Sequence, residues 1–515
     1  MRGILAWALG ALFLMGLGGC AGKDTSSLSE SQARRTIQAA LTDIEDIYYR
    51  ETKAAELVGA GLEEINVRYP TVEFSRRGEA IVATVEGNSV DSLAIQNDKG
   101  ASEKWAEQLT PMLVQIAAIL KGDDKPDLED LTDTFLGGIT NDLDPFTGYK
   151  SRREARTERQ RFSGKPGTLA IRVKREARGL RIVQVYIADA LGSGLLRQDD
   201  LIVEIDGVPT IGINEDTFQG LIRGAVGSPV VVKILRSNDE VPVTVPLQRE
   251  KDDANAVAVF REGDIQRIVV VRFHGRMIND LRDLLYDLKN DLQPAKGIIL
   301  DLRNNPGGLL DSTVSAADFF LSEGRILTTQ GRHSDSHQNF VASSAPPEID
   351  QPLVVLVDQS SAAGSEIVAA ALQDNGRAVV VGTATFGKGT IQTFLPMPNQ
   401  GIFGITWTEI YTPANYRLEK RGVMPTVCTG GDVTAEAILA DLRRGAGVID
   451  QATRTQDIDP DDDAAVAAFR SLCPPRSDGD DISLEVAEAI LADPALYAGV
   501  LGRERQTLHT RTAGN

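Results

Sequence analysis

Two short segments of the chain are almost wholly apolar, and a helical pattern precedes the first and lies between the two. Residues 353–357 are wholly apolar, and in residues 296–302 the apolar side chains are interrupted only by Lys296, Gly297 and Asp301. Strands of this kind are buried on both faces, as in a parallel sheet covered by helices. Three-to-four spacing of apolar residues predicts helices over 279–292 and 310–321. Residues 256–430 are therefore predicted to form an α/β core, with a site in the loops at the strand ends.

Length and charge limit what surrounds this core. A chain of 515 residues exceeds what one hydrophobic core usually supports, so several domains are expected. The predicted divisions, besides the core, are 1–20, 21–160, 164–250 and 431–515. The fold class is thus multidomain α/β. A formal net charge of −19 argues against an electrostatic nucleic-acid binder, and the acidity is interpreted as solvated surface.

The N-terminus has the features of a targeting segment. Arg2 is followed by an apolar run over 4–17 and then by Gly18, Gly19 and Cys20. The run is short for a membrane span, which needs roughly 20 apolar residues. Its end resembles the lipobox of bacterial lipoproteins, which implies that 1–20 is a signal peptide and that Cys20 becomes the lipidated N-terminus. An ordinary signal peptide or anchor with an incidental cysteine is the alternative.

The lipoprotein resemblance implies a periplasmic, lipid-anchored protein. Ala21 and Gly22 follow the cysteine without an acidic retention signal, which by analogy favours the outer membrane over the inner one. Export would place Cys428 and Cys473 in an oxidising compartment, where either a disulfide or two thiols is compatible with the sequence. Neither a metal nor a cofactor is expected, because no cluster of His, Cys or carboxylate residues has ligand spacing.

The region before the core is predicted to be mostly helical. Apolar spacing indicates helices over 31–49, 111–120 and 129–143, with Pro111 at a first helical position. The segment 144–149 then contains Pro and Gly, which stop a helix. The region is interpreted as a helical cap or dimerisation element without catalytic residues.

A second unit, 164–250, consists of short strands bounded by turns and one helix over 215–223. Its order, with a hairpin turn at Asp206 and Gly207, resembles that of a PDZ domain. Such domains bind a peptide C-terminus as an added strand and capture its carboxylate with backbone amides of a Gly-rich loop. The residues that occupy this loop are Gly167, Thr168, Leu169 and Ala170.

Several motifs of the core occur in the order found in one protease family. They are LRNNPGG at 302–308, SSAAGSE at 360–366, QDNGR at 373–377 and TFGKGTIQ at 385–392. Together they resemble the carboxyl-terminal processing, or tail-specific, proteases of peptidase family S41, which carry a PDZ domain before the core. The resemblance implies a serine endopeptidase that acts on polypeptides with exposed C-termini.

The resemblance also implies a serine/lysine dyad. A serine hydroxyl needs a base, and a lysine whose pKa is lowered by burial can serve as one. Lys388 matches the lysine, between two glycines that let the chain bend inward, and Gln392 is placed to orient its amine. Asp374 matches an acidic position near the site, but it equally fits the end of a helix. The matching oxyanion-hole residues are Gly307, Gly308 and Gly364.

At the nucleophile position the chain departs from the family pattern. The catalytic serine of the family lies two residues before the serine of a Ser-Glu pair and about 25 residues before the lysine. Both rules point to residue 363, which is alanine here. A methyl group cannot form an acyl-enzyme. Neighbouring Ser361 or Ser365 as a substitute, an engineered serine-to-alanine change and a natural pseudoprotease remain open.

Beyond residue 429 helices are predicted over 433–443 and 484–492, with the Asp-rich 457–463 as a solvated linker and a disordered tail after Gly502. Two functions follow. The first is a carboxyl-terminal processing endopeptidase scaffold that is inactive as written; the alternative is a non-catalytic peptide-binding or adaptor lipoprotein. Homo-oligomers and a lipoprotein adaptor partner are both left open.

Overall fold

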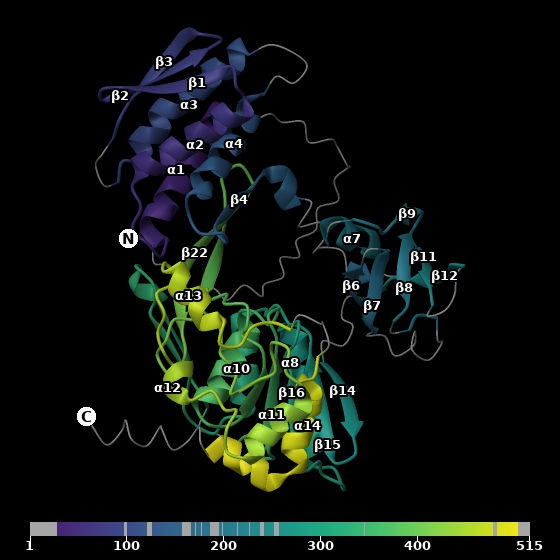
Figure 1. Ribbon diagram of the computed structural model, residues 1–515. Coiled ribbons are helices and arrows are strands. Elements are labelled where there is room, and N and C mark those ends of the chain that lie inside the picture. Colours follow the sequence, from purple (N-terminus) through teal and green to yellow (C-terminus); the bar gives the residue numbers. More distant parts are fainter. Residues whose placement is uncertain are drawn as a thin grey trace, which may run out of the picture.

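The computed structural model describes residues 28–502, apart from 97–99, 121–125, 157–165, 170, 177, 186–194, 198, 214, 226, 237–240, 252–256, 344–345 and 477–480. Figure 1 shows a helical N-terminal region at the top, a unit of short strands at one side, and a larger α/β body that carries the C-terminal helices. The predicted multidomain α/β class is confirmed.

The N-terminal region combines helices with a small antiparallel sheet. Its elements are α1 (Glu30–Ile47), α2 (Ala54–Arg68), α3 (Ser102–Ile119), α4 (Leu128–Asn141), β1 (Val72–Arg77), β2 (Ala80–Val85) and β3 (Asn88–Ala94). The expectation of a helical region missed this sheet, in which β1 and β3 keep most residues out of the core. Pro111 lies inside α3, not at its start, because the buried apolar stripe already begins at Trp105. Burial of that stripe offsets the cost of an interior proline.

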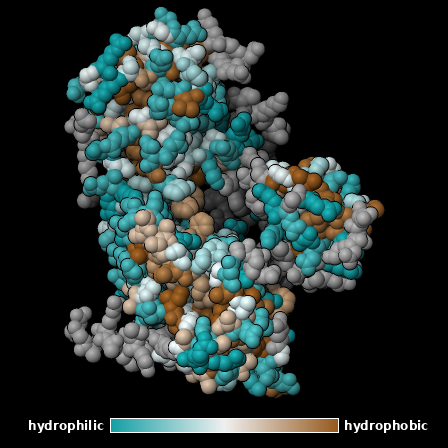
Figure 2. All heavy atoms as spheres, in the orientation of Figure 1, coloured by the Kyte–Doolittle hydropathy of each residue, from teal (hydrophilic) through white to brown (hydrophobic). Residues whose placement is uncertain are grey.

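The second unit has a core of its own. Its strands are β5 (Pro166–Thr168), β6 (Ile171–Glu176), β7 (Gly179–Val185), β8 (Leu201–Ile205), β9 (Val208–Pro209), β10 (Gly224–Ala225), β11 (Pro229–Leu235), β12 (Val243–Gln248) and β13 (Glu250–Lys251), with helix α7 (Glu215–Ile222). The main sheet has the order β12-β11-β8-β7-β6, so β6 is an edge strand. Apolar side chains also gather on the surface of this unit, at the right of Figure 2.

The α/β core is built on a mostly parallel sheet of order β14-β15-β16-β19-β20-β23. The strands are β14 (Val257–Glu262), β15 (Ile265–Val270), β16 (Gly297–Asp301), β19 (Leu353–Val357), β20 (Val379–Gly382) and β23 (Val427–Cys428), and the helices are α8 (Gly275–Lys289), α9 (Leu310–Asp318) and α10 (Gly364–Asp374). Every residue of β16 and β19 is buried, as their apolar sequences predicted.

A second sheet connects the core to the N-terminal region. It contains β17 (Arg325–Gln330), β18 (Gln338–Val341), β21 (Thr390–Pro396) and β22 (Ile402–Tyr411). Strand β4 (Gly148–Lys150), just after the N-terminal helices, pairs with β22. Phe403 and Ile405 of β22 lie in the same apolar cluster as the N-terminal helices, so these two parts share one core.

The C-terminal segment folds back onto the core through α11 (Ala435–Arg443), α12 (Gln451–Arg454), α13 (Asp463–Arg470) and α14 (Ser483–Ala492). The Asp-rich stretch 457–463, predicted as a solvated linker, keeps its aspartates exposed, and four of them also form ion pairs. Asp457 and Asp459 pair with Arg417, Asp461 pairs with Arg50, and Asp463 pairs with Lys420. Basic side chains of the core and of the N-terminal region thus face this acidic stretch.

Candidate active site

Three loops converge at one edge of the core sheet. The neighbouring parallel strands β16, β19 and β20 lead, at their carboxyl ends, into residues 302–308, 358–363 and 383–389. These loops carry the glycine motif, the nucleophile position and Lys388. Parallel topology therefore brings together three motifs that are far apart in the sequence.

Ala363 occupies a strained turn at the start of α10. Its backbone has φ +49° and ψ −107°, in a region that residues with a β-carbon rarely adopt. The side chain is half-buried, whereas those of Ala362 and Ser365 are buried. Strain of this kind is typical of functional sites, where a tight strand-to-helix turn exposes one side chain. The turn therefore presents residue 363 to the site.

The carboxylate of Glu366 joins this turn to the lysine loop. Its Oε2 accepts the N–H groups of Ala363 (2.8 Å) and Lys388 (2.9 Å). Its Oε1 accepts the hydroxyl of Thr385 (2.5 Å) and the N–H of Gly387 (2.7 Å). Because both N–H groups donate to the same oxygen atom, the backbone nitrogens of Ala363 and Lys388 lie within about 6 Å of each other. Burial raises the pKa of Glu366, and the four donors oppose that shift.

The glycine loop packs against the same turn. A β-carbon at Gly307, which has φ +93°, would lie 2.6 Å from the nitrogen of Gly364 and 2.9 Å from the β-carbon of Ala363. The N–H of Gly307 donates to Asn305 Oδ1 at 2.8 Å. Among the described residues neither the N–H of Gly308 nor that of Gly364 has a hydrogen-bond acceptor. These two amides are the candidate oxyanion donors. Gly307 lacks a β-carbon and so lets the glycine loop pack closely against Ala363 and Gly364.

Lys388 is half-buried, and its Nζ lies 4.6 Å from the centre of the Phe146 ring. Burial lowers its pKa, while the carboxylates of Glu419, Asp144 and Glu366 oppose the shift. A lowered pKa is what a lysine base requires. The flanking glycines allow close packing here, since a β-carbon on Gly389 would lie 2.0 Å from the nitrogen of Glu419.

The other predicted site residues are placed differently. The amide nitrogen of Gln392 donates to the hydroxyls of Thr390 and Thr406, both at 3.1 Å. Asp374 ends α10 and accepts the N–H of Ala414 at 3.2 Å. At a rise of 1.5 Å per residue, Asp374 lies about 16 Å along the helix from Ala363. The structure does not bring Asp374 to the nucleophile position; burial raises its pKa to about 6.

The two neighbouring serines are fully buried and serve the fold. Ser361 Oγ donates to the carbonyl of Leu302 at 2.8 Å. Ser365 Oγ donates to the carbonyl of Asn305 at 2.8 Å. Both hydroxyls hold the turn against the glycine loop, so neither is presented in place of the missing hydroxyl at 363.

Sequence reasoning missed three residues at this site. Glu366 served only to set the register, although its position three residues into a helix is a known capping position. Glu419 accepts the N–H of Gly389 at 2.8 Å, and burial raises its pKa to about 7. Phe146 comes from the N-terminal region. No sequence signal marks Glu419 or Phe146, because each reaches the site only through the tertiary fold.

The predicted peptide-binding loop is already hydrogen-bonded. Gly167 and Thr168 belong to β5, which pairs with β10 and β13. The N–H of Leu169 donates to the carbonyl of Ile222 in α7 at 3.3 Å. Ala170 lies outside the described residues.

The remaining predicted features divide between the described and undescribed parts. Cys428 and Cys473 form a disulfide with an S–S distance of 2.03 Å. Cys20 and the tail after Gly502 lie outside the described residues. Within the described part, no helix is long and apolar enough to cross a membrane, and no group of His, Cys, Asp or Glu could hold a metal ion.

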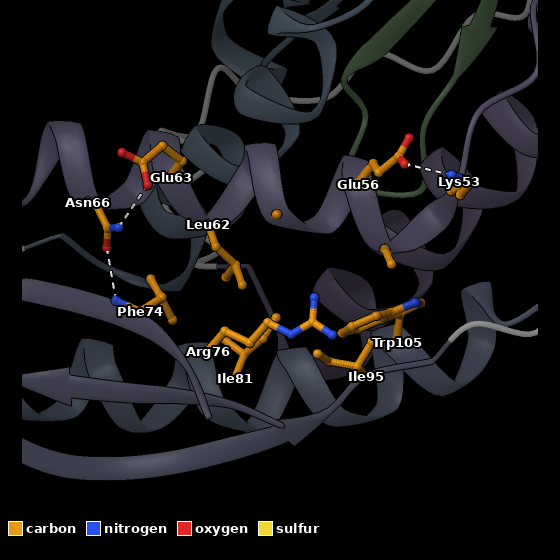
Figure 3. A pocket seen from close by; sticks show the side chains of 12 residues that line it. Lys53, Glu56, Leu62, Glu63, Asn66, Phe74, Arg76, Ile81, Ile95 and Trp105 are labelled. Carbon is orange, nitrogen blue, oxygen red and sulfur yellow. Dashed lines mark hydrogen bonds and ion pairs between the residues drawn. The ribbon is translucent and has the colours of Figure 1, made fainter. Parts of the chain in front are cut away.

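A separate cavity of about 460 Å³ lies in the N-terminal region, between α2, the β1–β3 sheet and α3. Figure 3 shows Leu62, Ile81 and Ile95 along its apolar wall, with the Arg76 guanidinium beside Trp105. It contains none of the predicted site residues.

Comparison with known proteins identifies similar chains. The model of peptidase family S41 matches residues 264–429. A carboxy-terminal-processing protease of Bartonella bacilliformis is 31% identical over 379 residues, covering 72% of this chain and 85% of that protein. A carboxyl-terminal-processing protease of Synechocystis sp. is 35% identical over 262 residues, covering 50% and 60% of the two chains. A solved photosystem II D1 C-terminal processing protease is 20% identical with a TM-score of 0.45, covering 76% of this chain and 92% of that one.

Proposed function

The chain belongs to the carboxyl-terminal processing proteases of peptidase family S41, and we propose that as written it binds polypeptide C-termini without cleaving them. The observation that carries this proposal is the methyl group of Ala363 in an otherwise assembled site. Lys388, Glu366 and the free amides of Gly308 and Gly364 surround it. Hydrolysis through an acyl-enzyme needs a hydroxyl at this position.

In the serine form of this site each group has a distinct role. The neutral amine of Lys388 would take the proton of the hydroxyl at 363 as its oxygen attacks the peptide carbonyl. The amides of Gly308 and Gly364 would donate to the resulting oxyanion. The same lysine would then return the proton to the leaving amine. With alanine, the site keeps the lysine and the oxyanion donors but lacks the oxygen atom that would attack the peptide carbonyl.

Restoring the hydroxyl tests this assignment. Three proteins are compared on a fluorogenic peptide with a free C-terminus: the chain itself, Ala363→Ser, and Ala363→Ser with Lys388→Met. We expect the single variant to cleave at least about a thousandfold faster than the other two, because serine and lysine act as a unit. Cleavage by the chain itself would overturn the proposal. No gain on restoring serine would show that the site has diverged beyond residue 363.

We also propose that the unit from β5 to β13 has a PDZ fold and captures the C-terminus. Support comes from β6, an edge strand whose outer backbone groups can take an added strand. Helix α7 lies beside it, since Phe218 and Ile222 share a core with Ile171. Fluorescence anisotropy should show at least about tenfold tighter binding of a free-acid peptide than of its C-terminal amide. Equal binding of the two peptides would argue against carboxylate capture.

Lipid anchoring at Cys20 is a further proposal, supported by the lipobox-like sequence. It places the protein in the periplasm on a membrane, with the outer membrane favoured over the inner one. The change Cys20→Ser should move the protein from the membrane fraction to the soluble fraction of a bacterial expression host. Retention of the variant in the membrane fraction would indicate an uncleaved anchor instead.

A further inference from the structure

The turn that follows α4 brings an aromatic ring of the N-terminal region to the lysine of the core. Phe146 lies within this turn, and its ring centre is 4.6 Å from Lys388 Nζ. A cation over an aromatic face at this distance is attracted by the ring quadrupole. In the described part of the chain, the Lys388 ammonium has neither a hydrogen bond nor an ion pair. The ring of Phe146 is therefore its closest defined partner.

The turn is rigidly held. Asp144 accepts the N–H of Phe146 at 2.9 Å and the hydroxyl of Thr147 at 2.5 Å. The N–H of Asp144 donates to the hydroxyl of Tyr48 at 3.1 Å. Thr406 of β22 donates its N–H to Thr147 Oγ1 at 3.0 Å. Bonds to both α1 and β22 neighbours fix where the Phe146 ring lies.

The same turn determines which group donates and which accepts in a chain of hydrogen bonds that ends at Gln392. The hydroxyl of Thr406 donates to Asp144 Oδ1 at 2.8 Å. Its single proton is then used, so it accepts from the Gln392 amide nitrogen at 3.1 Å. That nitrogen also donates to Thr390. The carbonyl oxygen Oε1 of Gln392 is left without a donor among the described residues and can accept one from an amine.

We propose that the turn 144–147 positions the lysine base. Phe146 holds the Lys388 ammonium in the resting site, and Asp144, through Thr406, keeps the Gln392 carbonyl oxygen ready to accept a hydrogen bond from Lys388 when it leaves the ring. The N-terminal region is thereby part of the catalytic apparatus. This inference rests on the proposed role of Lys388 as the base.

The ring is tested by NMR titration of Lys388 in the chain as it stands, with Ala363 in place. Signals of the lysine side chain are assigned by comparison with Lys388→Arg. Carboxylates of Glu419, Asp144 and Glu366 act on Lys388 in every sample. Phe146→Leu keeps an apolar neighbour but removes the quadrupole, so the pKa of Lys388 should fall by about half a unit. The ring-current shift of its side-chain protons should also disappear.

Phe394→Leu is the matched control, because Phe394 lies on β21 and its side chain is 68% exposed. It should leave both the pKa and the proton shifts of Lys388 unchanged. Unchanged values in Phe146→Leu as well would overturn the role of the ring. The titration needs no cleavage, so it stays decisive even where Ala363→Ser shows no activity.

The hydrogen-bond chain is tested through the side-chain amide protons of Gln392. They should exchange slowly with solvent in the parent chain and in Thr406→Ser, which keeps the hydroxyl. In Thr406→Val they should exchange at least about tenfold faster, because one of the two acceptors is lost. Equal exchange in the serine and valine variants would overturn the role of Asp144 and Thr406.

Discussion

Ala363 is the residue at which the conflict between backbone and side chain is clearest. Its φ of +49° and ψ of −107° suit glycine, yet the position carries a β-carbon. Such a conformation costs on the order of 1–3 kcal/mol. A methyl group cannot act as a nucleophile, so this strain does not contribute to catalysis in the chain as written. The turn therefore preserves the geometry of a nucleophile without the nucleophile.

Relief of this strain is measurable. Ala363→Gly should raise the free energy of unfolding by about 1 kcal/mol, since the strain relieved exceeds the added entropy of glycine in the unfolded chain. Ala369→Gly, in the middle of α10, is the control and should lower it by a similar amount. Chemical denaturation gives both values. A loss of stability in Ala363→Gly would mean that the turn is unstrained.

Glu419 gives a pH-dependent signature. Burial raises the pKa of its carboxyl from 4.5 to about 7 in the folded protein. The folded state binds the Glu419 proton more tightly than the unfolded state does. The stability contributed by protonated Glu419 is therefore lost as the pH rises from about 4.5 to 7. Glu419→Gln should thus gain about 3 kcal/mol over the parent chain between pH 4.5 and pH 8. Denaturation at the two pH values measures this gain, and a difference independent of pH would contradict it.

Residues within one motif were predictable at the site, whereas partners from other elements were not. Sequence spacing assigned Ala363 to the nucleophile position and Lys388 to the lysine position. In the structure the backbone N–H groups of both residues donate to Glu366. Phe146 lies in a segment that the sequence describes only as a turn, and no sequence pattern marks Glu419. Their proximity to Lys388 depends on how β22 pairs with β4 and on how the chain returns after β22.

At the scale of elements, the C-terminal helices support the lysine loop. The guanidinium of Arg470, at the end of α13, donates to the carbonyl of Thr385 at 2.6 Å. The carbonyl of Cys473 accepts the N–H of Ala384 at 3.2 Å, and its side chain is bonded to Cys428. The segment that follows the acidic stretch therefore supports the lysine loop through Arg470 and Cys473.

Loss of this brace should loosen the loop selectively. In Arg470→Met the amides of residues 384–389 should exchange hydrogen about tenfold faster, because Thr385 loses a charged donor. Arg443→Met, at the exposed end of α11, is the control and should leave that segment unchanged. Hydrogen exchange followed by mass spectrometry resolves the two. Equal exchange in both variants would show that Arg470 does not support the loop.

Apolar strands and amphipathic helices were predictable because burial dictates their sequences. The buried strand over 353–357 was predicted at its observed limits. The β1–β3 sheet and α13 were missed because each has few buried residues, so their patterns are dominated by solvent-facing side chains. For such elements neighbouring segments, not the local sequence, decide the structure.

In the whole molecule, the N-terminal region and the α/β body are coupled. Arg332 of the body donates to the carbonyls of Ile44, Glu45 and Tyr48 at the end of α1. Lysine and arginine side chains stabilise helix ends in this way. The unit from β5 to β13 instead buries an apolar cluster made only of its own residues. We therefore expect it to unfold separately from the rest of the chain.

Calorimetry should show this separation as two transitions, of which the lower belongs to the smaller unit, because a small core buries less surface per residue. A free-acid peptide at one hundred times its dissociation constant should stabilise only that unit, by about 2.7 kcal/mol. Binding must also release the N–H of Leu169 from the carbonyl of Ile222 if this amide captures the carboxylate. The C-terminal amide of the peptide at the same concentration serves as control and should stabilise this unit by no more than about 1.4 kcal/mol. A shift of the upper transition by the free acid would place the capture site in the α/β body instead.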